Sequence, residues 1–217
     1  MRIGLIGFGK MGREVDSIAR EQGETIVRVF DSRHAVRAEA LEGIDVCIDF
    51  STPETVLTNI RTAVEARKDI VVGTTGWYEH LPELRKSVQQ SGLLYAANFS
   101  LGMNMFFRIV SRAAELMKNA SEYDAFIHEI HHRQKKDSPS GTALRLAAVL
   151  GKPELPISSS RAGFVTGTHT IGFDSEADSI ELKHTAKNRR GFALGALKAA
   201  RWLRGRKGIY TMDDVDF

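Results

Sequence analysis

The sequence predicts an α/β protein, a Rossmann-type doubly wound parallel sheet joined to a second, α+β domain. Between residues 2 and 97, short apolar segments alternate with helical patterns, which is typical of parallel strands with right-handed crossovers. A glycine-rich turn follows the first of these segments. Beyond residue 98 the pattern changes to a long helix and two segments of alternating polarity, as expected for antiparallel strands.

Composition sets broad limits on function. The chain has 217 residues, 42% hydrophobic and 26% charged, with a net charge of +3. This charge is too weak to argue for a nucleic-acid partner. The single cysteine, Cys47, lies in an apolar run and is expected to be a core residue. No apolar run approaches the ~20 residues of a membrane span, and the chain begins directly with a strand, so we expect a cytoplasmic protein without a membrane partner.

The first strand, residues 2–6, leads into a G-x-G-x-x-G turn, a helical pattern and a second strand over 25–30. In such a turn the first glycine permits the bend, the second lets a pyrophosphate approach the backbone, and the third lets the helix pack closely. Free N–H groups at the helix start then face the phosphates. We therefore expect a dinucleotide site; the alternative is a glycine turn that binds nothing. The three glycines are Gly7, Gly9 and Gly12.

The second strand ends at Asp31, about twenty residues beyond the glycines, where a carboxylate accepts hydrogen bonds from the adenosine ribose. This acid favours NAD. Arg33 follows closely and is suited to a 2′-phosphate, although it is equally read as a solvated surface arginine. Use of NADH, NADPH or both therefore stays open.

Further strands are expected over 45–50, 69–72 and 93–97, with helices opening at Pro53 and covering about 81–90. Ligands in parallel sheets lie beyond the carboxyl ends of the strands. The segments Gly73–Gly76 and Asn98–Ser100 follow strand ends and are expected beside the nicotinamide.

In the second half, helices are expected over 104–118 and 142–150, and strands over 124–130, 167–173 and 179–184. Residues 151–163 read as a loop. A final amphipathic helix and a short strand at 209–210 return to the first domain. The predicted boundaries are 1–98, completed by 189–217, and 99–188.

The densest chemistry lies in residues 129–143, EIHHRQKKDSPSGTA. A helix start is expected here, with Ser138 as its cap and Pro139 in the first turn. The backbone N–H groups of Gly141 and Thr142, with the hydroxyls of Ser140 and Thr142, form a site for a carboxylate.

Cationic side chains precede this helix. Together they suit a second carboxylate or a developing negative charge, and one histidine of the pair can act as a general acid. The alternatives are a solvated charged face and a metal site with His128 and Glu129. Strand alternation separates His128 from the next histidine, so we expect no metal. The cationic residues are His131, His132, Lys135 and Lys136.

These motifs resemble the dihydrodipicolinate reductase (4-hydroxy-tetrahydrodipicolinate reductase) family over nearly the full length. Residues 129–143 are similar to the family's E-x-H-H-x-x-K-x-D-x-P-S-G-T-A. Supporting matches are GFGKMG at 7–12, DFSTP at 49–53, GTTGW at 73–77, AANFSLGMN at 96–104, ELKHTAKNRRGFALGAL at 181–197 and YTMDDV at 210–215.

The resemblance implies reduction of a cyclic imine dicarboxylate with NADH and/or NADPH in lysine and diaminopimelate biosynthesis. It implies a homotetramer joined through the second domain, which serves substrate binding and oligomerisation. It assigns catalysis to His131, as proton donor or acceptor, and to Lys135, as the other proton donor or a substrate anchor; whether His131 or water delivers the proton stays open. It assigns substrate binding to His132, Gly141, Thr142 and Arg189, and the Ser140 hydroxyl at the same helix start is expected to join them. It assigns the cofactor to Gly7, Phe8, Gly9, Lys10, Met11, Gly12, Asp31, Gly73, Thr74, Thr75, Ala97, Asn98, Phe99 and Ser100. Arg33 joins this set because its charge suits a 2′-phosphate.

The chain departs from the family pattern in three places. Its glycine loop is one residue shorter than the common G-x-x-G-x-M-G, and the stretches 31–44 and 151–161 are compact, so this is a short form. Two other functions fit the same plan. One is a different amino-acid or sugar dehydrogenase, although no Glu-Lys-Pro signature is found. The other is a non-catalytic dinucleotide sensor, which would not need residues 129–143.

Overall fold

The computed structural model describes residues 1–152 and 154–216 and divides into two compact units. Unit 1 comprises Met1–Leu101 and Arg189–Phe217, and unit 2 comprises Gly102–Asn188. Within the described residues, no helix combines the length and hydropathy needed to cross a bilayer.

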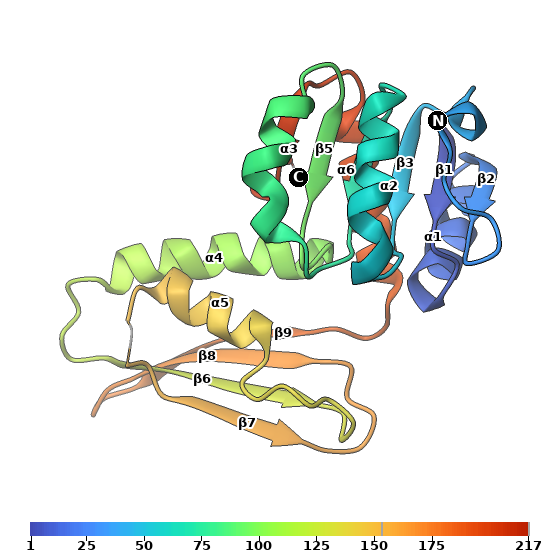
Figure 1. The fold of residues 1–217 in the computed structure, drawn as a ribbon. Helices are drawn as coiled ribbons and strands as arrows, with labels where there is room; N and C mark the ends of the chain where they lie inside the picture. Colours follow the sequence, from blue (N-terminus) through green and yellow to red (C-terminus); the bar gives the residue numbers. More distant parts are fainter. Residues whose placement is uncertain (153, 217) are drawn as a thin grey trace. The chain divides into compact units, whose positions relative to one another are not determined.

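Unit 1 is built on a six-stranded parallel sheet (Figure 1). The chain runs outward from β1 to β2, then crosses to the other side of β1 and continues outward from β3. The switch point between β1 and β3 is where open α/β sheets bind ligands. In sheet order the strands are β10 (Gly208–Tyr210), β5 (Gly92–Tyr95), β4 (Asp69–Val72), β3 (Val46–Asp49), β1 (Arg2–Ile6) and β2 (Thr25–Phe30).

Helices cover both faces of this sheet because its strands are apolar on both sides. In β3, Val46 and Ile48 pack with α1 (Lys10–Glu21) and α6 (Arg190–Leu203). Cys47 points to the opposite layer, which contains α2 (Pro53–Glu65) and α3 (Leu81–Ser87). Cys47 is fully buried and burial raises its pKa to about 12, as fits a core residue rather than a nucleophile. Two short 3₁₀ helices complete the unit, η1 (Ala38–Leu41) and η2 (Tyr78–His80).

Unit 2 is a four-stranded mixed sheet with two helices on one face (Figure 1). Its strand order is β7-β6-β8-β9; β7 is parallel to β6 and the other neighbours are antiparallel. Apolar residues of alternate strand positions pack against both helices. The elements are α4 (Leu101–Met117), β6 (Asp124–His131), α5 (Gly141–Leu150), β7 (Ile157–Arg161), β8 (Thr168–Asp174) and β9 (Ser179–Thr185).

One prediction about this unit is wrong. Residues 151–163, expected as a loop, contain β7; residue 153 of this stretch lies outside the described residues. The sequence of β7, ISSSR, has no apolar alternation to identify it as a strand. Its strand conformation depends on parallel pairing with β6, a contact between residues thirty positions apart.

Candidate active site

The glycine loop after β1 has a different constraint at each glycine. Gly7 has φ +85°, and a Cβ there would lie 2.4 Å from the carbonyl oxygen of Phe50. A Cβ on Gly12 would lie 2.1 Å from the carbonyl oxygen of Gly7. At Gly9, by contrast, a Cβ would meet no atom within 4 Å. Gly7 and Gly12 are therefore required by the fold, whereas Gly9 leaves space above the loop for a ligand.

Gly9 is also the N-cap of α1, where no side chain caps the helix. The backbone N–H groups of the first turn, which include those of Lys10 and Met11, therefore remain available to phosphate oxygens. The guanidinium of Arg13 lies over the ring of Phe8 at 5.3 Å and adds positive charge beside the loop.

A cavity of about 700 Å³ extends from this loop to the end of β2. Asp31 lines it and accepts hydrogen bonds from the backbone N–H of Arg33 (2.9 Å) and of His34 (3.1 Å). Its second oxygen accepts from the Arg33 guanidinium at 3.3 Å. The backbone hydrogen bond from Arg33, followed by the side chain of His34, lowers the pKa of Asp31 to about 2. The carboxylate is thus ionised and placed to accept ribose hydroxyls. The size and donor set of this cavity fit the adenosine half of a dinucleotide.

A buried carboxylate that sequence reasoning did not single out organises the next two strand ends. Asp49, fully buried at the end of β3, accepts from the N–H (2.9 Å) and hydroxyl (2.7 Å) of Ser51. It also accepts from the Thr74 hydroxyl at 2.8 Å and the Asn59 amide at 2.9 Å. Burial raises the pKa of Asp49, and these hydrogen bonds oppose the effect. Asp49 therefore fixes the orientation of Thr74, one of the predicted cofactor residues.

The remaining predicted cofactor residues follow β4 and β5 at the same edge of the sheet. A Cβ on Gly73 would lie 2.1 Å from the Phe50 ring, so this strand end is tightly packed. Asn98 accepts the N–H of Ser100 at 2.9 Å and shapes the turn after β5. Phe99 is buried in the core, with its ring 6.0 Å from that of Phe50. Gly73, Thr74 and Thr75 follow β4, and Ala97, Asn98, Phe99 and Ser100 follow β5.

In unit 2 the predicted carboxylate site lies at the start of α5. Ser140 is the N-cap; its hydroxyl accepts the N–H of Ala143 at 3.2 Å. The prediction of Ser138 as the cap is wrong. The backbone N–H of Ser140 donates to Glu129, and its extended conformation (φ −68°, ψ 153°) lets the helix begin only at Gly141. A Cβ on Gly141 would meet nothing within 4 Å, so the helix start is open to a ligand.

Glu129 accepts hydrogen bonds from three different residues of unit 2. It is fully buried, and its Oε1 accepts from the Ser140 N–H (3.0 Å), the Ser159 hydroxyl (2.8 Å) and the Arg161 guanidinium (2.8 Å). Burial alone raises the pKa of a carboxyl group, but hydrogen bonds from Ser140, Arg161 and Ser159 outweigh it here and lower the pKa to about 2. Its other oxygen, Oε2, lies 3.1 Å from Nδ1 of His131.

The predicted acid, His131, lies at the end of β6 and is 7% exposed. Burial lowers its pKa, the charge of Glu129 raises it, and Lys135 and Arg161 lower it further. Lys135 pairs with Asp137, its Nζ 2.8 Å from Oδ1. His132 is half-buried, and Lys136 is exposed. The structure therefore brings His131, Lys135, Ser140 and Gly141 into one unit around Glu129.

Glu129, His131 and His169 have the spacing of metal ligands, with their donor atoms within 4.8 Å of one another. Burial lowers the pKa of His169 to about 4, so its ring is neutral. Glu129 is already neutralised by Arg161, and a divalent cation would have to enter beside that guanidinium. His128, considered for a metal from the sequence, contacts Ser160 at 3.2 Å instead.

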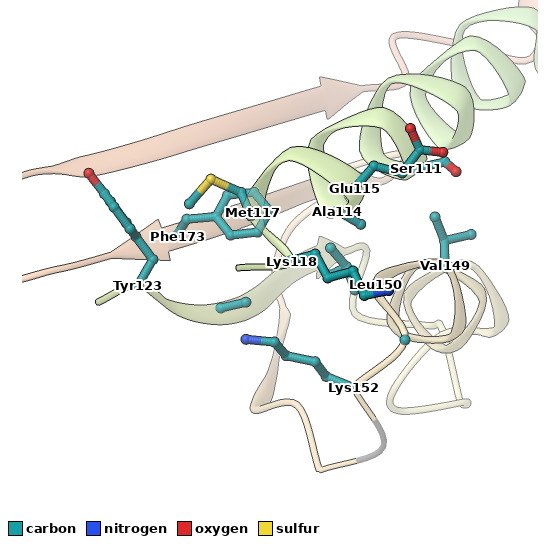
Figure 2. A pocket seen from close by; sticks show the side chains of 12 residues that line it. Ser111, Ala114, Glu115, Met117, Lys118, Tyr123, Val149, Leu150, Lys152 and Phe173 are labelled. Atoms are coloured by element: carbon teal, nitrogen blue, oxygen red, sulfur yellow. The ribbon is translucent and has the colours of Figure 1, made fainter. Parts of the chain in front are cut away.

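Two further features do not belong to this group. Arg189 belongs to unit 1, where it is exposed just before α6. A cavity of about 360 Å³ lies at the opposite end of α5 from Gly141, between the C-terminal ends of α4 and α5 (Figure 2). Lys118, Tyr123 and Phe173 line it, and none of the predicted site residues does.

Asp49, Ser159, Arg161 and His169 were missed by sequence reasoning. Asp49 stood in the quoted DFSTP motif, so the signal was an acid at a strand end. His169 faces Glu129 across the β6–β8 pair, and Ser159 faces it across β6–β7. These two partners become visible only when the strand register is known.

Comparison with known proteins decides the family. Residues 1–99 match the family model of the dihydrodipicolinate reductase N-terminus, and residues 102–215 match that of its C-terminus. The chain belongs to the dihydrodipicolinate reductase family. The family, fold class and oxidoreductase activity predicted from the sequence are thereby confirmed.

Curated relatives of this reductase family span the whole chain. The 4-hydroxy-tetrahydrodipicolinate reductase of Christiangramia forsetii is 40% identical over 232 residues, covering 99% of this chain and 97% of that protein. The enzyme of the same name from Archaeoglobus fulgidus is 35% identical over 257 residues, covering 99% of both chains. The relatives' reductase names and the dehydrogenase fold imply a nicotinamide cofactor.

Solved structures show the same fold. A dipicolinate-bound dihydrodipicolinate reductase from Paenisporosarcina sp. TG-14 superposes with a TM-score of 0.83 at 24% identity, over 99% of both chains. An amine dehydrogenase from Mycobacterium smegmatis superposes with a TM-score of 0.64 at 12% identity, over 100% of this chain and 96% of that chain. The fold is therefore shared with dehydrogenases of other substrates.

Proposed function

We propose that this chain reduces 4-hydroxy-tetrahydrodipicolinate to tetrahydrodipicolinate in lysine and diaminopimelate biosynthesis, with NADH or NADPH as the hydride donor. The observation that carries this proposal is the Glu129 group, which holds a protonatable histidine and an open helix N-terminus in one unit. A dinucleotide sensor would need the glycine loop but not this group.

The substrate is a cyclic dicarboxylate, and unit 2 offers two kinds of anion donor. One carboxylate is held by the N–H groups of Gly141 and Thr142 with the hydroxyls of Ser140 and Thr142. The second is held by His132 and Lys135. When the substrate binds, the Lys135 ammonium group leaves the Asp137 carboxylate and pairs with a carboxylate of the substrate instead.

Loss of water from the substrate leaves a conjugated ring, and the reduction adds one hydride and one proton to it. A nicotinamide cofactor, when bound, would supply the hydride. His131 supplies the proton from its imidazolium form, and Lys135 stabilises the negative charge that develops on the ring. Burial keeps the His131 pKa low in the free protein, but a dianionic substrate raises it on binding.

Unit 1 holds the cofactor, with pyrophosphate on the N–H groups at the start of α1 and ribose on Asp31. The side chains of Arg33 and His34 both contact Asp31. Arg33 is positively charged and His34 can become so, and both therefore suit a 2′-phosphate. We therefore propose that both NADH and NADPH are used. Gly73, Thr74 and Thr75 and the 97–100 turn contact the nicotinamide end.

A homotetramer and a cytoplasmic location complete the proposal. Register places Phe126 and Ile130 of β6 on the sheet face opposite Ile127, which packs in the helix-covered core. Both side chains are only half-buried, so this face suits contact with a second copy. Light scattering of the purified protein measures its mass directly.

The test is steady-state oxidation of NADH and NADPH with freshly generated substrate. Lys135→Ala and His131→Ala should each lose about 10²-fold in kcat, while NADH binding stays within about twofold. Lys86→Ala, at an exposed position of α3 outside both proposed sites, is the control and should keep its rate. NADH binding without turnover of the unmodified protein would favour the sensor. Near-normal rates in both variants would remove His131 and Lys135 from the mechanism.

A further inference from the structure

We propose that Glu129 is a positioning residue for this reaction, which together with Arg161 holds the proton donor and the carboxylate-binding helix start in one fixed geometry. The inference rests on the proposed function, because it takes His131 as the acid and α5 as the carboxylate site. It assigns a role to Glu129 and Arg161, which belong neither to the proposed acid nor to the proposed carboxylate site.

The first observation is that one carboxylate joins three elements. Glu129 projects from β6, and its Oε1 accepts the Ser140 N–H at the start of α5. The same oxygen accepts from Ser159 and Arg161 of β7. Glu129 is fully buried and ionised. Moving any of these donors away would therefore leave its negative charge without full compensation.

The second observation is that Arg161 fixes the segment between the acid and the helix. Its Nη2 donates both to Glu129 Oε1 at 2.8 Å and to the carbonyl oxygen of Asp137 at 2.6 Å. The loop from His132 to Ser140 is therefore tied at Asp137 as well as at its end. This loop also contains Lys135, whose ammonium group donates to the carboxylate of Asp137, the residue whose carbonyl oxygen Arg161 holds.

The third observation concerns the two nitrogens of His131. Nδ1 lies 3.1 Å from Glu129 Oε2 in an ion-pair contact whose geometry is not that of a hydrogen bond. Nε2 lies on the side of Gly167, where a Cβ would approach it to 2.9 Å. The Glu129 carboxylate thus lies against one edge of the His131 ring, where its charge favours the protonated form and raises the pKa of His131.

His169 supports the group from β8. Its ring stands edge-on to His131 at 5.1 Å between centroids, and its Nε2 lies 3.3 Å from the Ser140 hydroxyl. With a pKa of about 4 it stays neutral at physiological pH and adds no charge that would repel protonated His131. The groups that face His131 are Glu129, Lys135, Asp137, Arg161 and His169.

A purely structural role for Glu129 would lower stability and leave the chemistry of folded molecules unchanged. A positioning role predicts effects on kcat, on the substrate KM and on the pH profile, without effect on cofactor binding. The charge of Glu129 raises the His131 pKa. Its loss should therefore move the alkaline limb of kcat/KM to lower pH.

The experiment uses Glu129→Gln in the full chain. We expect kcat to fall about 10- to 100-fold, with a higher KM for the ring substrate, as for other groups that orient a catalytic histidine. The KM for NADH should change less than twofold, and the alkaline limb should shift down. Glu129→Asp keeps the charge and should recover part of the rate. Asp124→Asn, at the exposed start of the same strand, is the control.

Stability and cofactor binding are measured on each variant, so that only folded protein is compared. If Glu129→Gln does not fold, Ser159→Ala removes a single donor and should lower kcat several-fold with no change in NADH binding. Unchanged kcat, substrate KM and pH profile in a folded variant would overturn the inference. If the unmodified protein shows no turnover, the proposed function fails instead, and the two failures are distinct.

Discussion

Arg161 and Glu129 form a buried ion pair, with Nη2 and Oε1 separated by 2.8 Å, between neighbouring strands β7 and β6. Glu129 is fully buried and the Arg161 side chain is 18% exposed. Removing one partner from such a pair is costly because the other charge is left without compensation. This pair therefore links the stability of unit 2 to the geometry of its proposed site.

Replacing the guanidinium tests this link. Arg161→Met should lower the free energy of unfolding by roughly 3 kcal/mol, because the Glu129 carboxylate would remain buried with fewer donors. Urea unfolding followed by circular dichroism measures the change. Arg112→Met is the control: Arg112 pairs with Glu115 on an exposed surface, and its loss should cost less than about 1 kcal/mol. Equal costs for the two variants would contradict the burial argument.

The low pKa of Glu129 predicts how stability depends on pH. Its folded value is about 2, against an ordinary value of 4.5. The ionised form thus stabilises the folded chain fully above pH 4.5, and this contribution is lost as pH falls from 4.5 toward 2. The stability difference between the unmodified protein and Glu129→Gln should be largest above pH 5 and shrink toward pH 2. A difference that stays constant across this window would mean that folding does not lower the pKa of Glu129.

Two glycines with open space at their Cβ positions should separate the two ligands. Gly9→Ala fills the space above the phosphate loop and should raise the KM for NADH and NADPH about tenfold or more, while the substrate KM is unchanged. Gly141→Ala is the reciprocal variant and should raise the substrate KM alone. Steady-state titration of each ligand measures both. Melting temperatures near that of the unmodified protein would show that the fold tolerates each methyl group.

Cofactor choice should depend on the charges at the end of β2. Asp31→Ala removes the acceptor for the ribose hydroxyls and should lower kcat/KM for NADH more than for NADPH. Arg33→Ala removes a partner of the 2′-phosphate and should act in the opposite direction, by about tenfold. The ratio of kcat/KM values for the two cofactors is the measurement. If Arg33→Ala leaves this ratio unchanged, Arg33 is a solvated surface residue.

The predicted parallel sheet is found because its signals are local. Each strand of unit 1 is an apolar run bounded by turns, and the helix at Pro53 begins where its capping signals predict. The return of the chain to this unit also appears, with β10 pairing to β5. The composition of residues 129–143 was enough to predict an anion-binding site, because two histidines and two lysines precede a glycine-containing helix start.

The supporting residues carried no such signal. Arg161 lies in a serine-rich segment that reads as a loop, and its strand exists through pairing with β6. Ser138 satisfied the local rules for a helix cap, but Ser140 takes that position because a buried carboxylate eleven residues away binds its N–H. Tertiary contacts outweighed local preference at both places.

The sequence by itself determined the strand–helix alternation, the glycine loop with its acid, and the two histidines and two lysines that precede a glycine-containing helix start, because these are patterns of neighbouring residues. Only the tertiary structure decided that Glu129 is the hub, that Arg161, Ser159 and His169 surround it, and that Asp49 holds Thr74. These partners are distant in the chain, and hydrogen bonds and charge compensation at 3 Å depend on strand register and burial rather than on local sequence.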